Sequence, residues 1–422
     1  MARQMKNSGV EWIGNIPSDW KIRRNKTLFD CSKKIIGDAS KDTQLLSLTT
    51  QGVKTKSKDA IGGKVPESFD TYQTVMPDDI VMCLFDLDCS AVFSGISPYY
   101  GMISPAYDII KCKSGLLPKY ADYWFKFVFD GRKFKSYAKN LRYTLNYNEF
   151  AFLPFALPSI SEQEKIVDFL DKKCAEIDTV IAKTKATIEE YKKLKQSIIT
   201  EAVTKGVRGD RPMKDSGIEW IGAIPADWQV SPLQYYVELN KNTLGEDTPA
   251  DYEFDYVEIG AVTLENGISE YQRYKFADAP SRARRIVQAN DIIISTVRTY
   301  LKAIAIVPEK ENVIVSTGFA VLTPKKINID YLGFALKSEY FVHTVTANSV
   351  GISYPAINSS DLIKFKIAIP AEDEQEEIAE YLKKKCAEMD TLIRKKTALL
   401  SEMESYKKSI IYEYVTGKKE VL

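Results

Sequence analysis

The side chains that could carry out catalysis are few and widely spaced in this sequence. The single histidine, His343, has no serine or cysteine nucleophile elbow near it in the sequence. Four acids between residues 78 and 88 could form a carboxylate cluster for a metal ion, but acids at turns and strand ends explain them more simply. These acids are Asp78, Asp79, Asp86 and Asp88. The pattern predicts no catalytic residue and no metal site.

Motifs for binding a cofactor are also absent. The sequence has no phosphate-binding loop, and no glycine-rich turn that would hold a dinucleotide or S-adenosylmethionine. Residues 97–100 (SPYY) and 104–107 (SPAY) faintly resemble the Asn/Asp-Pro-Pro-Tyr motif of amino-methyltransferases, but they lack the amide or acid and the second proline. The six cysteines include no CxxC pair, so neither a disulfide framework nor a zinc site is indicated. We expect no cofactor.

Clusters of basic residues are the stronger chemical signal. Residues 132–148 hold five bases and no acid, interleaved with tyrosines and asparagines; residues 53–64 hold four lysines, and residues 271–302 are rich in arginine. Lys and Arg bind phosphates, while Arg, Asn, Ser and Thr can also read base edges. Each cluster alone could equally be a solvated surface loop, but one cluster set in each half of the chain favours DNA.

The candidate DNA-binding residues fall into two groups. In the first half they are Lys54, Lys56, Lys58, Arg132, Lys133, Lys139, Arg142, Tyr143 and Asn146. In the second half they are Arg273, Lys275, Arg282, Arg284, Arg285, Arg298, Lys302, Ser353 and Tyr354.

Length and charge limit the class of protein. At 422 residues the chain is long enough for two or three domains, and 45% hydrophobic residues suffice for their cores. The 58 Lys and Arg nearly balance the 57 Asp and Glu, which excludes a globally basic nucleic-acid binder that acts alone. The longest apolar runs are too short to cross a membrane, and the first residues do not read as a secretory signal. We expect a cytoplasmic protein.

An internal repeat determines the expected architecture. Residues 5–20 (MKNSGVEWIGNIPSDW) and 213–228 (MKDSGIEWIGAIPADW) are identical at twelve of sixteen positions, at an offset of 208. A second repeat joins residues 161–181 to 373–393 at an offset of 212, and its continuation also matches. Two collinear repeats indicate a tandem duplication of about 210 residues.

Each half ends in a segment with a helical pattern. Residues 161–204 contain no proline or glycine, and apolar residues recur at about 3.5–3.6 residues, with a capping-box signature at Ser161 and Glu164. The second copy starts near residue 373, and each helix would be roughly 66 Å long. The apolar residues expected between the two helices are Leu170, Ile177, Ile181, Ile188, Tyr191, Ile198, Leu382, Met389, Ile393, Leu400, Met403 and Ile410.

These patterns predict an α+β protein. Two globular domains would be separated by two long helices packed as an antiparallel coiled coil, in a pseudo-two-fold tandem repeat. The second helix must run antiparallel, because it leaves the second domain and has to return along the first helix to bury its stripe. The expected segments are a globular domain at 1–160, a spacer helix at 161–204, a second domain at 205–371, and a second spacer helix with a tail at 372–422.

The doubled signatures match a known family. Each half opens with WIGNIPSDW or WIGAIPADW, continues with EQEKIVDFLDKKCAEID or EQEEIAEYLKKKCAEMD, and closes its helix with SIITEAVTKG or SIIYEYVTGK. Over essentially its whole length the chain resembles the specificity subunit of type I restriction–modification systems.

The resemblance implies a function and a set of partners. Each variable domain would be a target recognition domain that reads one half of a bipartite site in double-stranded DNA. The helices would set the gap between the half-sites and dock two methyltransferase subunits, to which restriction subunits (an ATP-dependent translocase and nuclease) are added. The chain itself would be non-catalytic. The alternative is a two-headed structural adaptor that tethers protein partners without touching DNA; a self-sufficient methyltransferase is disfavoured because no cofactor loop is present.

Overall fold

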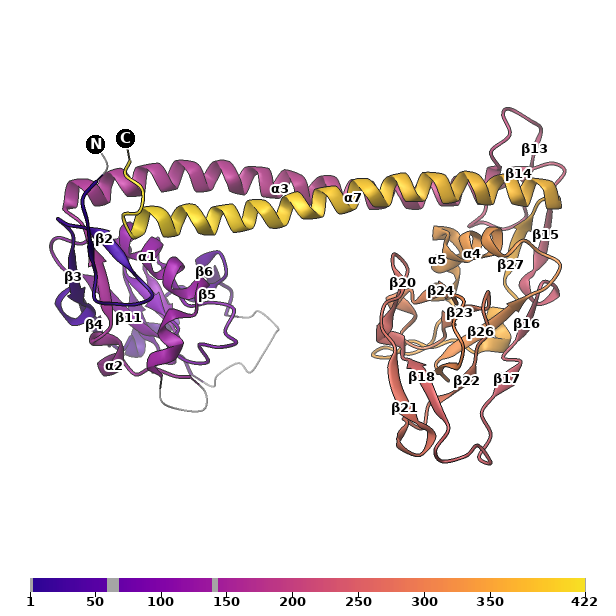
Figure 1. Cartoon of the computed structure of the whole chain (residues 1–422), viewed down its shortest axis with the longest axis horizontal. Coiled ribbons are helices and arrows are strands. Elements are labelled where there is room, and N and C mark those ends of the chain that lie inside the picture. Colours follow the sequence, from indigo (N-terminus) through magenta and orange to yellow (C-terminus); the bar gives the residue numbers. More distant parts are fainter. Residues whose placement is uncertain (1–2, 59–67, 139–142, 422) are drawn as a thin grey trace. The chain divides into compact units, whose positions relative to one another are not determined.

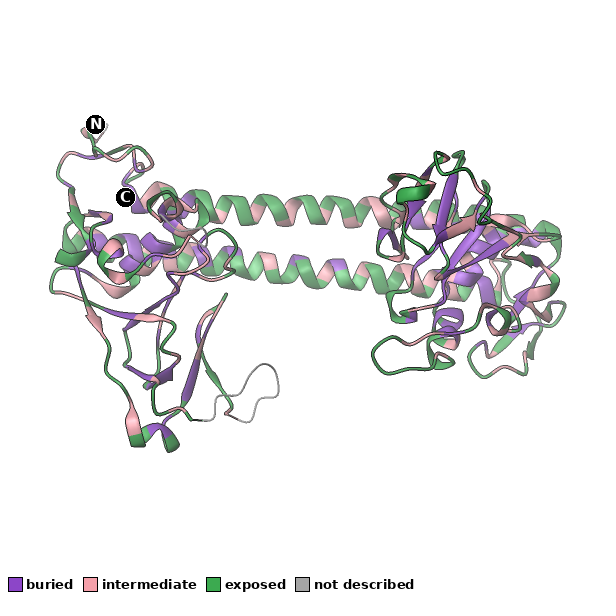
Figure 2. Ribbon diagram, turned by 90° about the horizontal axis from the view of Figure 1, so that it is seen from below, coloured by how far each residue is buried: buried purple, intermediate pink, exposed green. Residues whose placement is uncertain are grey.

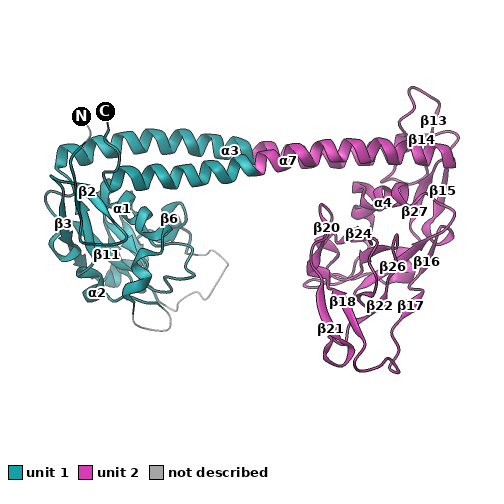
Figure 3. Cartoon of the chain, viewed as in Figure 1, with its two compact units in different colours: residues 1–185, 398–422 teal, residues 186–397 magenta. Residues whose placement is uncertain are grey.

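The chain forms two compact units. The structure, a computed structural model, describes residues 3–58, 68–138 and 143–421. Unit 1 contains residues 1–185 and 398–422, and unit 2 contains residues 186–397 (Figure 3). Unit 1 is therefore assembled from both ends of the chain, whereas unit 2 is one continuous segment.

Unit 1 is built on two four-stranded sheets (Figure 1). The first has the order β6-β5-β10-β7 and the second β4-β11-β8-β9; within the first sheet only β5 and β10 run parallel. The strands of the first sheet are β6 (Gly52–Lys56), β5 (Leu45–Thr49), β10 (Gly101–Ile103) and β7 (Gln73–Val75). Those of the second are β4 (Phe29–Ser32), β11 (Asp108–Cys112), β8 (Ile80–Met82) and β9 (Ser94–Ile96). Two short pairs complete the strands, β1 (Met5–Asn7) with β2 (Asn15–Pro17) and β3 (Lys21–Arg24) with β12 (Pro154–Leu157).

Unit 2 has the same strand order in its two larger sheets. Its five-stranded sheet reads β21-β18-β25-β22-β17, and its parallel pair, β18 with β25, stands where β5 and β10 stand in unit 1. Its four-stranded sheet, β16-β26-β23-β24, matches β4-β11-β8-β9 strand for strand. The strands are β21 (Gln272–Lys275), β18 (Glu253–Val257), β25 (Val313–Ser316), β22 (Ala283–Ile286), β17 (Asn242–Thr243), β16 (Val237–Leu239), β26 (Phe319–Pro324), β23 (Ile292–Ser295) and β24 (Ile304–Ile306). Two-stranded pairs join β13 (Met213–Asp215) to β14 (Ala223–Pro225), β15 (Gln229–Pro232) to β27 (Lys366–Ile369), and β19 (Val262–Thr263) to β20 (Gly267–Ile268).

Helices join the sheets of each unit to the long helices α3 (Ile160–Lys205) and α7 (Glu372–Val415). In unit 1, α1 (Pro118–Asp130) shares a buried core with α3 and α7, and α2 (Tyr147–Ala151) precedes the last strand. In unit 2, α4 (Ile329–Lys337) and α5 (Glu339–Ala347) take the place of α1, and α6 (Ser359–Leu362) that of α2. The mixed helix and sheet content confirms the α+β class. None of the described helices has an apolar stretch that could cross a membrane.

The long helices form where the sequence pattern predicts them, but the predicted cap of α3 at Ser161 is wrong. Helix α3 begins one residue earlier than expected, at Ile160, and the side chain at its start is Ser159. The Ser159 Oγ accepts a hydrogen bond of 3.3 Å from the backbone N–H of Glu162. Ser161 is already inside the helix, because Ser159 provides the cap immediately after Pro158.

Helices α3 and α7 run in opposite directions within each unit. In unit 1, the rings of Phe169 and Tyr414 are 4.3 Å apart, and Lys407 forms an ion pair of 2.6 Å with Asp178. In unit 2, Lys195 binds Asp390 at 2.7 Å. All twelve stripe residues named from the sequence are buried or half-buried, while the outward faces of both helices are exposed (Figure 2).

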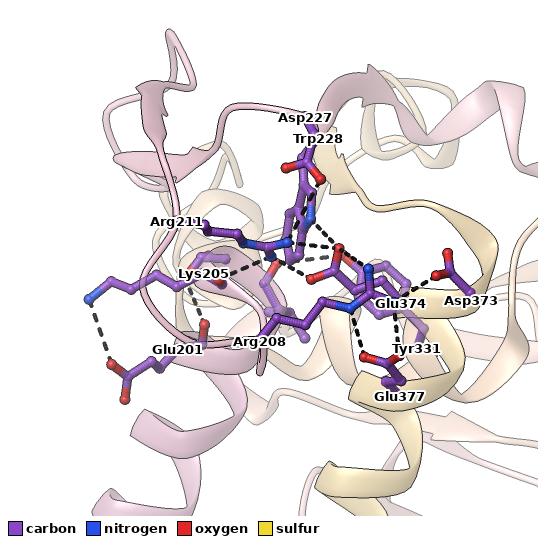
Figure 4. Close-up of polar contacts among 12 residues, drawn as sticks. Glu201, Lys205, Arg208, Arg211, Asp227, Trp228, Tyr331, Asp373, Glu374 and Glu377 are labelled. Atoms are coloured by element: carbon purple, nitrogen blue, oxygen red, sulfur yellow. Dashed lines mark hydrogen bonds and ion pairs between the residues drawn. The ribbon is translucent and has the colours of Figure 1, made fainter.

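The start of each long helix carries a carboxylate that joins three segments, fully buried in unit 2 and half-buried in unit 1. In unit 2, Glu374 is fully buried and accepts hydrogen bonds from the Trp228 indole (2.9 Å) and from the Arg211 guanidinium (3.0 Å), which also lies over the indole ring (Figure 4). In unit 1, Glu162 accepts from Trp20 (2.8 Å) and Arg3 (3.0 Å) in the same arrangement. We call each of these arrangements the Trp–Glu–Arg joint.

Neighbouring residues repeat in the same way. Gln163 and Gln375 each bind a proline carbonyl and the backbone N–H that precedes a helix. The buried hydroxyl of Tyr120 donates to carbonyl groups of Ala156 and Val415, as Tyr331 does to Ala368 and Val203. Val415 and Val203 lie at the end of a long helix, where no further turn supplies backbone N–H groups for their carbonyls. The tyrosine hydroxyls provide the missing donors.

The Trp–Glu–Arg joint of unit 2 predicts a difference between two arginines. Arg211→Ala should leave Glu374 buried without its cation and destabilise unit 2 by about 3 kcal/mol. Arg208 binds the exposed acids Asp373 and Glu377, so Arg208→Ala should have a much smaller effect. Urea unfolding of the two variants of the full chain would measure the difference; equal losses would contradict the central role of Glu374.

Candidate nucleic-acid interface

The candidate residues of unit 2 lie in three places. Arg273 and Lys275 are on β21, and Arg284 and Arg285 are on β22 with Arg282 just before it. Arg298, Lys302, Ser353 and Tyr354 lie on two loops beyond β23 and α5. Among the described loop residues, Arg298 and Tyr354 are brought into contact from the two loops.

On β21 the positive charge of Arg273 is neutralised. The Arg273 guanidinium forms ion pairs with Glu253 at 3.1 Å and with Asp255 at 3.3 Å. Asp255 also binds Lys310 at 2.8 Å, and the hydrogen bonds from Lys310 and then Arg273 lower the pKa of its carboxyl. Arg273 is therefore already matched by carboxylates from within the unit.

The arginines of β22 mainly make contacts within the unit. Arg284 lies 4.6 Å above the ring of Phe276 and donates to the carbonyl of Ala283. Arg285 donates a hydrogen bond of 3.2 Å to the hydroxyl of Thr243 on β17. Both side chains are half-buried, whereas Lys275 and Arg282 are exposed.

Two loops of unit 2 are tied to each other. Residues 296–302 connect β23 to β24 and include the 3₁₀ turn η7 (Thr299–Leu301); residues 349–357 follow α5. The hydroxyls of Thr299 and Ser349 are 2.8 Å apart, and the N–H of Ile357 donates to the carbonyl of Thr296 at 2.9 Å. We call these two segments the unit 2 loop pair.

The unit 2 loop pair presents arginine and aromatic side chains without any acid. Neither segment contains Asp or Glu, and Arg298 and Lys302 are both exposed. The Arg298 guanidinium lies 4.9 Å from the centre of the Tyr354 ring, which is 65% exposed. Such a surface can contact phosphates, stack on sugars or bases, and donate hydrogen bonds to base edges.

Unit 1 has a corresponding loop pair, made of residues 83–93 between β8 and β9 and residues 132–146, of which 139–142 are outside the described residues. The Arg132 guanidinium donates to the carbonyls of Leu87 (3.1 Å) and Ser90 (3.0 Å), so it fixes the first loop. The N–H of Leu87 donates to the carbonyl of Tyr143, and the Lys135 ammonium lies 4.2 Å from the Tyr143 ring. A cation on an aromatic ring thus occurs in both loop pairs.

The remaining candidates of unit 1 are spread over several elements. Lys54 and Lys56 are exposed on β6, while the Lys58 ammonium donates to the carbonyls of Ser40 and Lys41. Asn146 caps α2, where its side chain and that of Glu149 form a capping box. Lys133 is half-buried in the 3₁₀ turn η3 (Lys133–Tyr137). The candidates Lys139 and Arg142 lie outside the described residues.

Sequence reasoning missed the exposed apolar side chains of the unit 2 loop pair. Tyr300 is 51% exposed, and Ile352 is completely exposed at the tip of the hairpin closed by Val350 and Ala356. Composition gave no sign of them, because tyrosine and isoleucine in a β-rich segment read as core residues. The glycine and proline around Ile352, at Gly351 and Pro355, were the available signal for an exposed turn.

Asp79, His343 and Cys83, whose side chains have catalytic potential, all have structural roles. The Asp79 carboxylate accepts the N–H of Met76 in its own turn, and the ring of His343 packs against that of Trp220, with the ring centres 4.6 Å apart and the planes tilted by 41°. Burial raises the pKa of the Cys83 thiol, which disfavours the reactive thiolate. Among the described residues no group of three or more His, Cys, Asp or Glu could hold a metal ion.

Comparisons with known proteins point to one family. Residues 225–402 match the model of the type I restriction modification DNA specificity domain. The specificity subunit of the type I restriction enzyme MjaVIII of Methanocaldococcus jannaschii is 26% identical over 280 residues, which cover 64% of this chain and 63% of that subunit. The match therefore spans less than two thirds of that relative.

Two longer matches cover nearly the whole chain. The putative type I restriction enzyme MjaX specificity subunit of the same organism is 24% identical over 97% of this chain and 96% of its own length. A solved structure concerned with complex assembly and conformational transition of the type I restriction–modification system has a TM-score of 0.67, with 14% identity, over 95% of this chain and 98% of that one. At that identity the structural match supports the fold alone.

In its sequence repeats, its family domain and its fold, the chain is similar to the DNA specificity subunits of type I restriction–modification systems.

Proposed function

We propose that the chain is the DNA specificity subunit of a type I restriction–modification complex, and that each unit reads one half of a bipartite site in double-stranded DNA. The observation that carries the proposal is the duplicated loop pair. Each unit holds one, at the end of equivalent strands (β8 and β23), on sheets of the same order. Two similar reading surfaces with different side chains suit two different half-sites.

The chemistry of the loop pairs supports DNA as the ligand. In unit 2, the Arg298 guanidinium lies on the exposed Tyr354 ring, Lys302 is exposed in the same loop pair, and neither loop contains an acid. Protein side chains of this kind contact phosphates and base edges together. The adaptor alternative is not favoured, since the matching family model and the named relatives are DNA specificity proteins.

The long helices are proposed to set the spacing between half-sites as an antiparallel coiled coil in a tandem repeat. Two ion pairs between the helices support this pairing. In the first, Asp178 of α3 binds Lys407 of α7; in the second the charges are exchanged, and Lys195 of α3 binds Asp390 of α7. In this proposal the chain is non-catalytic. Methyl transfer would come from two methyltransferase subunits, and ATP-dependent translocation and cleavage from restriction subunits.

Exposed apolar residues on the helices support two docking sites for the methyltransferase subunits. Val180 and Leu392 are exposed and stand 212 positions apart, as do Leu194 and Tyr406. Unit 1 therefore carries Val180 and Tyr406, and unit 2 carries Leu194 and Leu392, so that each unit offers an equivalent pair of exposed apolar side chains, with one member from each helix. Equivalent sites of this kind fit two copies of one partner.

The recognition of a bipartite site can be tested directly. The chain would be co-expressed with the methyltransferase subunit of its own system in cells lacking other adenine methylation, and methylated positions would be mapped by single-molecule sequencing. We expect one motif of two short specific half-sites separated by a gap of fixed length. A continuous motif, or no methylation beyond that of the methyltransferase alone, would contradict the proposal.

The near balance of charge predicts weak binding by the isolated chain. With a net charge of +1, the chain has little excess charge with which to release counterions from DNA. Footprinting at about 150 mM salt should show site-specific protection only when methyltransferase subunits are bound. Tight, specific protection by the chain alone would count against this division of labour.

The docking sites predict a change in stoichiometry. Leu194→Lys combined with Leu392→Lys should reduce the number of bound methyltransferase subunits from two to one, because unit 1 keeps Val180 and Tyr406. Native mass spectrometry of the complex measures this number. The matched control is Glu190→Lys, an exposed polar position on the same helix, which should leave two subunits bound. Retention of both subunits by the double variant would show that they dock elsewhere.

A further inference from the structure

One strained backbone position occurs at the same place in both loop pairs. Asp86 in unit 1 has φ 51° and Arg298 in unit 2 has φ 50°, so both are left-handed. Each begins a tight turn: the N–H of Cys89 donates to the carbonyl of Asp86 at 3.1 Å, and the N–H of Leu301 donates to that of Arg298 at 2.8 Å. Asp86 and Arg298 are 212 positions apart in the sequence, the same offset that relates Glu162 to Glu374.

The flanking contacts show that the two positions are structurally equivalent. Before the strand, the carboxylates of Asp79 and Asp291 each accept the backbone N–H three residues earlier, at 2.9 and 2.8 Å. After the strand, the N–H of Leu145 donates to the carbonyl of Leu84, as that of Ile357 donates to Thr296. Every residue in these contacts has its counterpart 212 positions away. The backbone around residues 86 and 298 is therefore the same framework used twice.

The same left-handed backbone conformation recurs in both units although it is unfavourable, and this suggests that the position has a role. A left-handed conformation is unfavourable for most residues with a Cβ atom, less so for aspartate than for arginine, and glycine would avoid the cost. Both units instead keep a charged residue there, and the charge is opposite. In the Trp–Glu–Arg joints the residue types are identical between the units, because they serve the fold. A framework that is kept while its side chain is exchanged indicates a role for that side chain outside the fold.

Neither side chain is committed to a partner within its unit, and Arg298 is exposed while Asp86 is half-buried. Among the described residues, the Arg298 guanidinium has no ion pair or hydrogen bond, and it lies only against the ring of Tyr354. The Asp86 carboxylate likewise forms no ion pair with a described residue, although Arg132 binds the carbonyl of Leu87 next to it. Arg273, by contrast, is held by Glu253 and Asp255. Residues 86 and 298 therefore have unused hydrogen-bonding capacity.

We infer that Asp86 and Arg298 occupy equivalent base-reading positions, one in each unit. Resting on the proposed function, the inference assigns Arg298 to a guanine, to which the guanidinium would donate bidentate hydrogen bonds at O6 and N7. It assigns Asp86 to a cytosine, whose N4 amino group would donate to the carboxylate. The Tyr354 ring, packed against Arg298, would restrict the guanidinium to one orientation.

The test uses glycine variants, because glycine accepts the left-handed backbone and keeps the fold. Methylation rates of the methyltransferase complex would be measured on duplexes in which each base pair of each half-site is replaced in turn. Arg298→Gly should lose about tenfold or more of the discrimination at one G·C pair of one half-site, and Asp86→Gly the same at one G·C pair of the other. Asp86→Asn should shift the preference at its pair towards A·T, since Asn pairs with adenine.

Matched controls separate this inference from simpler explanations. Asp88→Gly lies two residues from Asp86 on the same loop, and Arg273→Ala removes an arginine already bound to carboxylates; both should keep the wild-type preference at every position. If the wild-type complex has no bipartite motif, the proposed function fails. If the motif exists but both glycine variants keep it unchanged, or lose activity evenly on all sequences, residues 86 and 298 do not read bases and the inference is overturned.

Discussion

The hydrogen-bonded carboxylate at the start of each long helix is the interaction on which the rest of the structure depends. Glu374 and Glu162 lie in the first turn of α7 and α3, where the helix dipole favours a negative charge. Each accepts from a buried tryptophan of the opening repeat and from an arginine just before it. A buried carboxylate without such donors would be strongly unfavourable, so the three segments have to assemble together.

The long helix that ends in each unit, α3 in unit 2 and α7 in unit 1, completes the Trp–Glu–Arg joint of that unit. Gly206 ends α3 with φ +79°, and a Cβ atom there would meet the side chains of Arg211, Glu374 and Trp228. Gly417 follows α7 with φ +67°, where a Cβ would meet Pro17 and Trp20. Only glycine permits both the left-handed turn and this close approach. Unit 2 builds its joint along one continuous chain through residues 206–211, whereas unit 1 builds the same joint from the two ends of the chain (Figure 3).

Local sequence patterns made the long helices predictable. The pairing of the strands and the contacts of the surface arginines have no local pattern and could not be predicted. The helical period without proline or glycine located α3 within a residue at each end. The cap was predicted at Ser161 instead of Ser159, because both serines precede an acid by three residues. The sheets could be recognised only as α+β, since their pairing is non-local: β18 runs parallel to β25 from more than fifty residues away. Composition also could not separate Arg273, which is bound by two carboxylates, from Arg298, which is not.

The two kinds of region in each unit obey different physical constraints. A buried joint tolerates almost no change, because each side chain in it satisfies a hydrogen bond or fills space for the others, and this explains why its residues recur in both halves. A surface loop is less restricted at positions whose side chains take no part in the contacts that hold it. Arg132 and the Thr299–Ser349 pair help to hold the loops, whereas the side chains of Asp86 and Arg298 do not. The bonds from Leu145 to Leu84 and from Ile357 to Thr296 use only main-chain atoms. The loop pairs can therefore keep one shape while carrying an acid in unit 1 and an arginine in unit 2, an arrangement that would suit the two different half-sites of the proposed function.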